Sequence, residues 1–415
     1  MNRTVTLTLF GAIYAFAGTA IAGPPQNTAD YREWDLIAEA AAKIQTYYVQ
    51  PVAMSEISDN AVAGMLAGLD PHSSYMNPKH FAAMVVNTKH DSVGVGLQIK
   101  ITGAGQAKVI APLAGSPAER AGIKPGDYIA EIDGTVVQDL PLDTVIAMLQ
   151  GVKGSICKLI VYRRGVEEPM EYSLAREEIV NDPVRWERKG DIGYISLNAM
   201  SEQASAEVEK AVRALKKGGA VKGYVLDLRN DPGGLLDQAV EVADAFLDEG
   251  KIVTTRGRHP GDEQRFDAHA GDVTDGKPLV VLINDGSAAG SEIVAAALQD
   301  HKRAIIIGSR SFGEGTIQTI IPLGGDRGAL RLTTSLFYRP SGQPIQTAGV
   351  EPDINVSQTP KGAFAPAPVR SETALANHLT GGTLQAAGGI IYPDAASTDA
   401  DFQLSFALDY LNRKK

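Results

Sequence analysis

Cysteine and long apolar segments are scarce in this sequence of 415 residues. Its one cysteine, Cys157, cannot form a disulfide within the chain, so export would not bring disulfide stapling. The alternating stretch around it, SICKLIVYRR, predicts a buried strand position, although a reactive thiol is the alternative. Beyond residue 22 no apolar run is long enough to span a bilayer.

The sequence also lacks an excess of positive charge and any histidine spacing typical of a metal site. Its 39 basic and 49 acidic side chains give a net charge of −10, which argues against a nucleic-acid partner. His72 lies in a Pro-His turn and His301 in a predicted loop, so we interpret both as structural. We therefore expect no metal, no cofactor and no nucleic acid.

The first 22 residues have the layout of a secretory signal peptide. One cation, Arg3, precedes an apolar stretch that ends in the sequence AIA at positions 20–22. Small residues then occupy both positions that signal peptidase reads, so we expect cleavage before Gly23 and a periplasmic or secreted chain. An uncleaved inner-membrane anchor is the alternative, because residues 5–22 approach the length that spans a bilayer.

Changes of periodicity divide the rest of the chain into four regions. Residues 23–90 show helical apolar spacing, and residues 91–177 read as short strands with two short helices, a compact module. In residues 178–357 strands alternate with helices, which implies parallel strands joined by right-handed crossovers. Residues 358–415 predict a Pro/Ala-rich linker and a short C-terminal helix. The predicted fold class is multidomain, mixed α+β and α/β.

Several segments, taken in order, resemble the C-terminal processing peptidases, also called tail-specific proteases. As an ordered set over residues 30–356 they are specific, although no single segment would be. The resemblance implies an exported serine protease with a Ser–Lys dyad, a PDZ domain at residues 91–177 and an α/β core with crotonase-like or Clp-like layering. The segments are LDPHSSYMNP (69–78), VGVGLQI (93–99), SPAERAGIKPGDYIAEIDG (116–134), GVKGS (151–155), LDLRNDPGGLLDQAVEVADAFL (226–247), NDGSAAGSEI (284–293), ALQDHKRAIIIGSRSFGEGTIQ (297–318) and RPSGQPIQTAGVEPDI (339–354).

Both catalytic positions of that family are substituted here. The family turn typically reads Gly-Ser-Ala-Ser-Ala-Ser-Glu, and the place of its nucleophilic serine is Ala289. The place of the general-base lysine, in a Phe-Gly-Lys-Gly motif, is Glu314, and the separation of the two positions agrees with the family. Gln318 matches the glutamine that orients the lysine. Because a Ser–Lys hydrolase needs a hydroxyl and a neutral amine, the chain lacks both reacting groups.

The turns that would form the oxyanion hole are retained. Gly290 opens the helix that follows position 289, so its N–H group could face an oxyanion. By the resemblance, Gly233 or Gly234 would supply the second donor, although a tight strand-to-helix turn would also explain these glycines. We interpret the nearby Ser287 as a helix N-cap rather than a replacement nucleophile. A further alternative is that Glu314 activates a water molecule directly.

Peptide binding is what the resemblance implies for the PDZ region. In such domains a glycine-flanked loop donates N–H groups to the terminal carboxylate of a peptide, which adds as a strand. A helix closes the other side of the groove, unless its apolar side chains belong to the core. The expected loop is Gly94, Val95, Gly96 and Leu97, and the expected helix residues are Leu142, Val145 and Leu149.

The sequence thus predicts an exported, proteolytically silent homologue that binds protein C-terminal segments or unstructured polypeptide. Two alternatives stay open: an active serine-type endopeptidase with a rearranged dyad, and a ligand-binding shell that kept the core without catalysis. An exported adaptor and a homo-oligomer are both compatible with the prediction.

Overall fold

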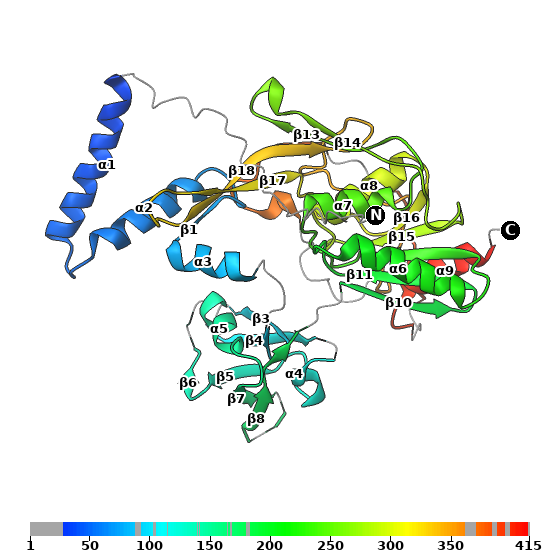
Figure 1. The fold of residues 1–415 in the computed structure, drawn as a ribbon, viewed down its shortest axis with the longest axis horizontal. Coiled ribbons are helices and arrows are strands. Elements are labelled where there is room, and N and C mark those ends of the chain that lie inside the picture. Colours follow the sequence, from blue (N-terminus) through cyan, green and yellow to red (C-terminus); the bar gives the residue numbers. More distant parts are fainter. Residues whose placement is uncertain are drawn as a thin grey trace, which may run out of the picture. The chain divides into compact units, whose positions relative to one another are not determined.

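The computed structural model describes residues 28–87, 93–102, 105–113, 115–138, 140, 142–163, 165–166, 168–179, 183–361, 371–383, 388–394 and 399–413 (Figure 1). The predicted signal peptide, residues 1–22, lies outside these ranges. The chain divides into two compact units, residues 1–64 and 65–415. In the described ranges no helix has the length and apolar character needed to cross a membrane.

The first unit is helical, in keeping with the helical apolar spacing of residues 23–90. α1 (Thr28–Tyr47) carries apolar side chains at helical spacing, but Trp34 among them is 60% exposed. α2 (Met54–Ala67) begins in this unit and ends in the second, where α3 (Pro78–Asn87) follows it. Pro51 lies between α1 and α2, where the fixed φ of proline disfavours helix continuation.

The PDZ region is an antiparallel sheet with strand order β3-β4-β5-β7-β8 and a short strand, β6, paired with β5. Cys157 lies on β7 and is fully buried with Leu159 and Val161, in keeping with the alternation of the sequence. Burial raises the pKa of the Cys157 thiol to about 11, so it is neutral at physiological pH. The elements are β2 (Val93–Gly94), β3 (Leu97–Ile101), β4 (Ala107–Pro112), α4 (Pro117–Arg120), β5 (Tyr128–Ile132), β6 (Thr135–Val136), α5 (Leu142–Leu149), β7 (Ile156–Tyr162), β8 (Met170–Ala175) and β9 (Glu177–Glu178).

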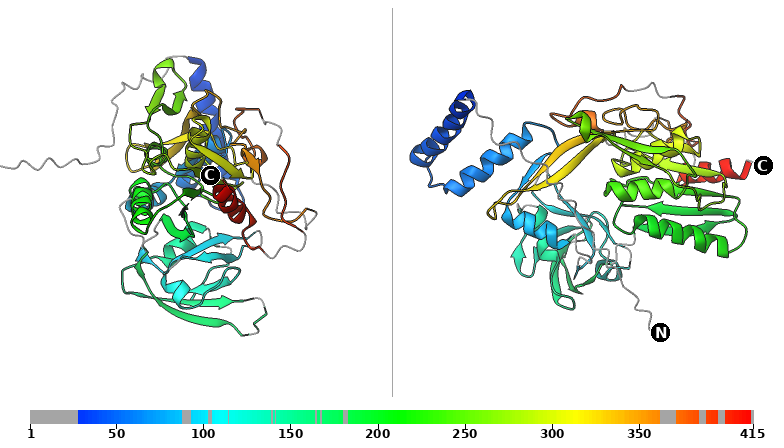
Figure 2. Two further views of the ribbon diagram at one scale, coloured as in Figure 1. Left: turned by 90° about the vertical axis from the view of Figure 1, so that its right-hand side faces the viewer. Right: turned by 45° about the horizontal axis from the view of Figure 1, so that its top comes forward.

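The core sheet has strand order β10-β11-β12-β15-β16-β19, parallel except for the β10–β11 pair. Successive residues of its buried strands face opposite sides: Val281 belongs to the buried cluster that includes residues of α6, α7 and α8, whereas Leu282 belongs to the cluster that includes residues of α9. Both faces are therefore covered by helices. In Figure 2, α9 is drawn in red and α6 and α7 in green. The elements are β10 (Val184–Lys189), β11 (Ile192–Leu197), α6 (Ala204–Lys217), β12 (Gly223–Asp227), α7 (Leu236–Asp244), β15 (Leu279–Ile283), α8 (Gly290–Asp300), β16 (Ala304–Gly308), β19 (Ile354–Asn355) and α9 (Phe402–Arg413).

A second sheet is built around the long strand β18. β17 pairs with β18 along one side, and β1 and β13 pair with β18 along the other. The elements are β1 (Ser74–Met76), β13 (Lys251–Gly257), β14 (Gln264–Asp267), β17 (Thr316–Pro322) and β18 (Ala329–Tyr338), with short 3₁₀ helices η1 (Pro260–Asp262) and η2 (Glu372–Ala374).

The region predicted to be a linker is in part packed against the core. Glu372 of η2 is 0% exposed, and its N–H group donates to the carbonyl of Phe312 at 2.9 Å. Gly382 donates to the carbonyl of Gln346 at 2.7 Å. The linker prediction is therefore wrong for this segment, because polar contacts rather than an apolar periodicity hold it. The C-terminal helix that the sequence predicted is α9.

Candidate functional site

The turn between β15 and α8 holds Ala289 in a strained backbone conformation. Its φ of 47° and ψ of −107° lie in a region that a residue with a Cβ atom rarely adopts. In hydrolases such a strand-to-helix turn exposes a nucleophile at its tip. Position 289 thus has the backbone geometry of a nucleophile elbow, but its side chain is a methyl group.

Ser287 is not the N-cap of this helix, which corrects the sequence prediction. The helix begins two residues later than a serine cap would require, and Ala289 occupies the cap position. The Ser287 hydroxyl is buried, donates to the carbonyl of Leu228 at 2.7 Å and accepts from the N–H of Asn284 at 3.0 Å. It connects the ends of two neighbouring strands.

The predicted oxyanion-hole glycines lie against this elbow. A Cβ atom on Gly233, whose φ is 87°, would lie 2.5 Å from the nitrogen of Gly290 and 3.0 Å from the Cβ of Ala289, so only glycine fits. The N–H of Gly233, however, donates to Asp231 at 2.9 Å. Among the described residues the N–H of Gly234 has no acceptor, which makes Gly234 the better second donor of the two that the sequence left open.

A buried carboxylate, Glu292, brings the two substituted positions together. It is 0% exposed, and its Oε2 accepts the N–H groups of both Ala289 and Glu314, each at 2.9 Å. Its Oε1 accepts the N–H of Gly313 at 2.7 Å and the hydroxyl of Ser311 at 2.5 Å. Burial raises the pKa of Glu292 to about 8, an effect that these donors oppose. The elbow and the loop of residues 311–314 are thus joined through one side chain.

The side chain of Glu314 contacts His72, which the sequence analysis had interpreted as structural. Glu314 Oε1 lies 3.3 Å from His72 Nδ1, and His72 Nε2 lies 2.9 Å from Glu372 Oε2. The hydrogen bond to Glu372 raises the pKa of His72, and burial raises the pKa of Glu314. Gln346 donates to the other oxygen of Glu372 at 2.9 Å. His72 belongs to a segment that resembled the family, which was a usable signal, whereas nothing in the sequence indicated Glu372.

Gln318 does not orient residue 314 by a hydrogen bond in the described part of the chain. It follows a β-bulge on β17, and its amide donates to Thr316 Oγ1 at 2.9 Å. Arg331 approaches its carbonyl oxygen at 3.5 Å. A role for Gln318 next to a lysine at position 314 stays a prediction.

Asp231 is a second buried carboxyl group beside the elbow. It is 0% exposed, and its Oδ2 has no hydrogen-bond partner among the described residues. Burial raises its pKa to about 7. In the described ranges no group of three or more His, Cys, Asp or Glu side chains could hold a metal ion.

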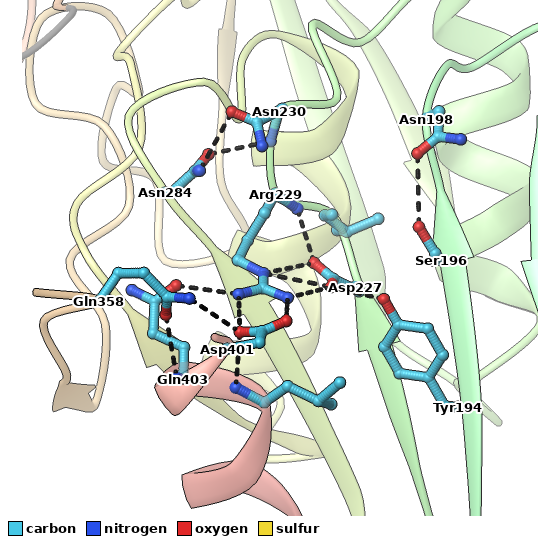
Figure 3. A network of polar contacts seen from close by, with 12 residues as sticks. Tyr194, Ser196, Asn198, Asp227, Arg229, Asn230, Asn284, Gln358, Asp401 and Gln403 are labelled. Atoms are coloured by element: carbon cyan, nitrogen blue, oxygen red, sulfur yellow. Dashed lines mark hydrogen bonds and ion pairs between the residues drawn. The ribbon is translucent and has the colours of Figure 1, made fainter. Parts of the chain in front are cut away.

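Arg229 supports the carboxyl end of the core sheet, as Figure 3 shows. It forms ion pairs with Asp227 at the end of β12, at 2.6 Å, and with Asp401 just before α9, at 2.7 Å. The neighbouring Asn230 and Asn284 form a second connection, in which the Asn230 N–H donates to Asn284 Oδ1 at 2.9 Å. These contacts hold the loop that leads to Gly233 beside the loop that leads to Ala289.

The expected carboxylate-binding loop of the PDZ region has two free donors. Val95 and Gly96 are buried, and their carbonyls accept the N–H groups of Ala118 and Leu113 at 3.0 and 2.9 Å. Their own N–H groups have no acceptor in the described ranges, which is unusual for buried backbone. Leu97, which is partly buried, begins β3, an edge strand that α5 contacts.

The helix side of the expected groove differs from the prediction. Val145 is 0% and Leu149 is 5% exposed, and both belong to the PDZ core. The apolar spacing of a short helix cannot distinguish its core side from its groove side, so the core alternative holds for both residues and their part in a groove stays a prediction. The side chain of Leu142 lies outside the described part of the structure.

Comparison with known proteins agrees with this geometry. The peptidase family S41 matches residues 191–356, and the PDZ domain matches residues 108–163. A carboxy-terminal-processing protease of Bartonella bacilliformis is 43% identical over 353 residues, 84% of this chain and 80% of that protein. A carboxyl-terminal-processing protease of Synechocystis sp. is 39% identical over 367 residues, 86% and 83% of the two chains.

Among solved structures, a photosystem II D1 C-terminal processing protease superposes with a TM-score of 0.53 and 30% identity, covering 78% of this chain and 93% of that one. The predicted fold class, a PDZ domain with an α/β protease core, is thereby confirmed. The chain belongs to the carboxyl-terminal processing protease family, within peptidase family S41.

Proposed function

We propose that this member of the family is exported, is proteolytically silent and binds protein C-termini through its PDZ domain. The observation that carries the proposal is the pair of side chains at the elbow, the methyl group of Ala289 and the carboxylate of Glu314 held by His72. Neither can attack a peptide carbonyl as the family dyad does. Loss of the nucleophile alone costs a serine protease roughly 10⁶ in turnover.

The nearby hydroxyl groups argue against a rearranged dyad. Ser291 Oγ is buried and donates to the carbonyl of Asp231 at 3.0 Å. Ser311 Oγ is buried and donates to Glu292 at 2.5 Å. Ser287 Oγ is also buried and donates to the carbonyl of Leu228. Each would have to break a buried hydrogen bond before it could react, at a cost of about 1–3 kcal/mol. Among the described residues, none of the three hydroxyl groups has an amine or imidazole as hydrogen-bond partner.

The free N–H groups of Val95 and Gly96 support C-terminus binding by the PDZ domain. Adjacent backbone donors form an anion site that suits a terminal carboxylate. We expect a peptide with an apolar C-terminal residue and a free carboxylate to bind weakly, and its amidated form not to bind. Isothermal titration of the two peptides checks this expectation, and equal titration of both would show that this loop is not the site.

Two glycines of the PDZ domain provide a matched pair of variants. Gly96 and Gly115 have similar φ values, 74° and 71°, so alanine at either is similarly strained. A Cβ atom at Gly96 would lie 2.2 Å from the Cβ of Ser116, whereas a Cβ atom at Gly115 meets nothing within 4 Å. We expect Gly96→Ala to lose peptide binding and Gly115→Ala to retain it.

A further inference from the structure

The outer edge of β17 is an unpaired sheet edge next to the elbow site. β18 is paired along both of its sides, and the pairing registers place β17 on the side opposite β1 and β13. Among the described residues no strand pairs with the other edge of β17. Half of its backbone N–H and C=O groups therefore point away from β18.

The composition of this edge is unusual for an unpaired strand. Edge strands usually carry charged side chains that prevent pairing with another chain. β14, at the opposite edge of the same sheet, has this protection, because its Arg265 and Asp267 are exposed and paired at 2.8 Å. β17 reads TIQTIIP, without a charge, and Ile321 is 38% exposed. The residue that would oppose strand addition, Pro322, comes only at its end.

The position of β17 connects it with the site. The strand begins at Thr316, two residues after Glu314. Gly315 between them is fixed, because its N–H donates to Gln346 Oε1 at 2.7 Å. The Thr316 end of this edge therefore follows directly on the loop that Glu292 holds against the elbow.

We infer that the outer edge of β17 binds an extended, uncharged polypeptide segment as an additional strand of the sheet. The chain belongs to a protease family, so the ligand for an edge that leads to its elbow is polypeptide. Binding through backbone hydrogen bonds tolerates many sequences, which suits unstructured chains. The inference deepens the proposed function and rests on it, since it describes how the core of a silent homologue still holds a polypeptide.

Photo-crosslinking of the full chain tests this inference. The probe is an uncharged ten-residue peptide with a benzoylphenylalanine at its centre and an amidated C-terminus, so that the PDZ loop is not engaged. We expect mass spectrometry to locate the crosslinks in residues 316–322. A second probe, with methyl groups on alternate backbone nitrogens, should label this strand about tenfold less, because it cannot complete the ladder.

Equal labelling by both probes, or labelling outside β17, would overturn the inference. Both probes are amidated, so they do not test binding at the PDZ loop. The PDZ proposal is tested separately, by the titration of the free and amidated peptides.

Two proline variants test the same edge from the protein side. Thr319 and Ile320 are adjacent and beyond the bulge, so the N–H of one faces β18 and that of the other faces the open edge. Proline at the residue whose N–H faces β18 breaks a hydrogen bond of the sheet and should lower the Tm. Proline at the other residue removes only the outward donor, so this variant should keep the wild-type Tm and lose the crosslink. If that variant is labelled like the wild type, the inference is wrong. If neither variant folds, the comparison of the two probes decides whether the inference holds.

Discussion

Single residues at the elbow determine the chemistry of this site through one shared acceptor. Glu292 accepts hydrogen bonds from the backbone of both Ala289 and Glu314, so one side chain holds the two positions that correspond to the family dyad. The carboxylate of Glu314 contacts His72, which in turn contacts Glu372. Hydrogen bonds thus hold both loops of the site, and under the proposed function the site lacks the two groups that react in the family.

Buried carboxyl groups near the elbow make stability depend on pH. Burial raises the pKa of Asp231 to about 7 and of Glu292 to about 8, above their values in the unfolded chain. Between the unfolded and folded values the folded state binds more protons, so stability falls as pH rises. The raised pKa of His72 acts in the same direction. We expect the free energy of unfolding, measured in urea, to decrease from pH 5 to pH 8.

Asp231→Asn isolates one of these groups. The amide keeps the acceptor for the Gly233 N–H but does not titrate. The free energy of unfolding should therefore decrease less between pH 5 and pH 8 than in the wild type, by up to a few kcal/mol, since one pKa unit corresponds to about 1.4 kcal/mol. Asp191 is exposed and its pKa is lowered by the hydrogen bond from Lys222, so Asp191→Asn is the control. An Asp231→Asn variant with the wild-type pH dependence would contradict this account.

At the scale of helices and strands, α9 closes one face of the core sheet. Its Leu411 is 4% exposed and packs with Val225 and Val280, which are fully buried. We expect Leu411→Ala to lower the free energy of unfolding by about 2–5 kcal/mol, because it leaves a cavity in this layer. Asp409→Ala, on the exposed side of the same helix, should change it by less than about 0.5 kcal/mol. Urea unfolding of the two variants checks this, and equal losses would contradict the role of α9.

The helices and strands differ in how far the sequence predicts them. Alternation and helical spacing predicted the core strands, α8 and α9, because burial on one or both faces imposes those patterns. They did not predict the segment around Glu372, because isolated polar contacts leave no periodic trace. The sequence predicts a cap at Ser287 because a serine before a helix usually caps it, whereas the elbow delays the helix to Gly290.

The sequence predicts the positions of the candidate site but not all of its contacts. The positions of Ala289 and Glu314 follow from motif spacing, which survives when side chains change. The partnership of His72 with Glu314 joins residues far apart in the chain and needed the folded structure. For Val145, spacing alone could not distinguish the core from the groove side of α5.

Across the whole molecule, the proposed function requires export. The small residues at positions 20–22 predict that the mature chain begins at Gly23. We expect the intact mass of protein from the periplasmic or secreted fraction to correspond to residues 23–415. A mass that retains residues 1–22, or a chain found in the cytoplasmic fraction, would contradict this prediction.

The central claim, that two substitutions silence the whole protein, is tested by restoring both. Cleavage of an unstructured polypeptide should be no faster with the wild type, Ala289→Ser or Glu314→Lys than with a heat-inactivated control. The double variant Ala289→Ser and Glu314→Lys should cleave it, because Glu292 and Gly290 still hold the elbow and the two residues act as one unit. Cleavage by the wild type that Glu314→Ala abolishes would contradict the account, since Glu314 would then itself be the base.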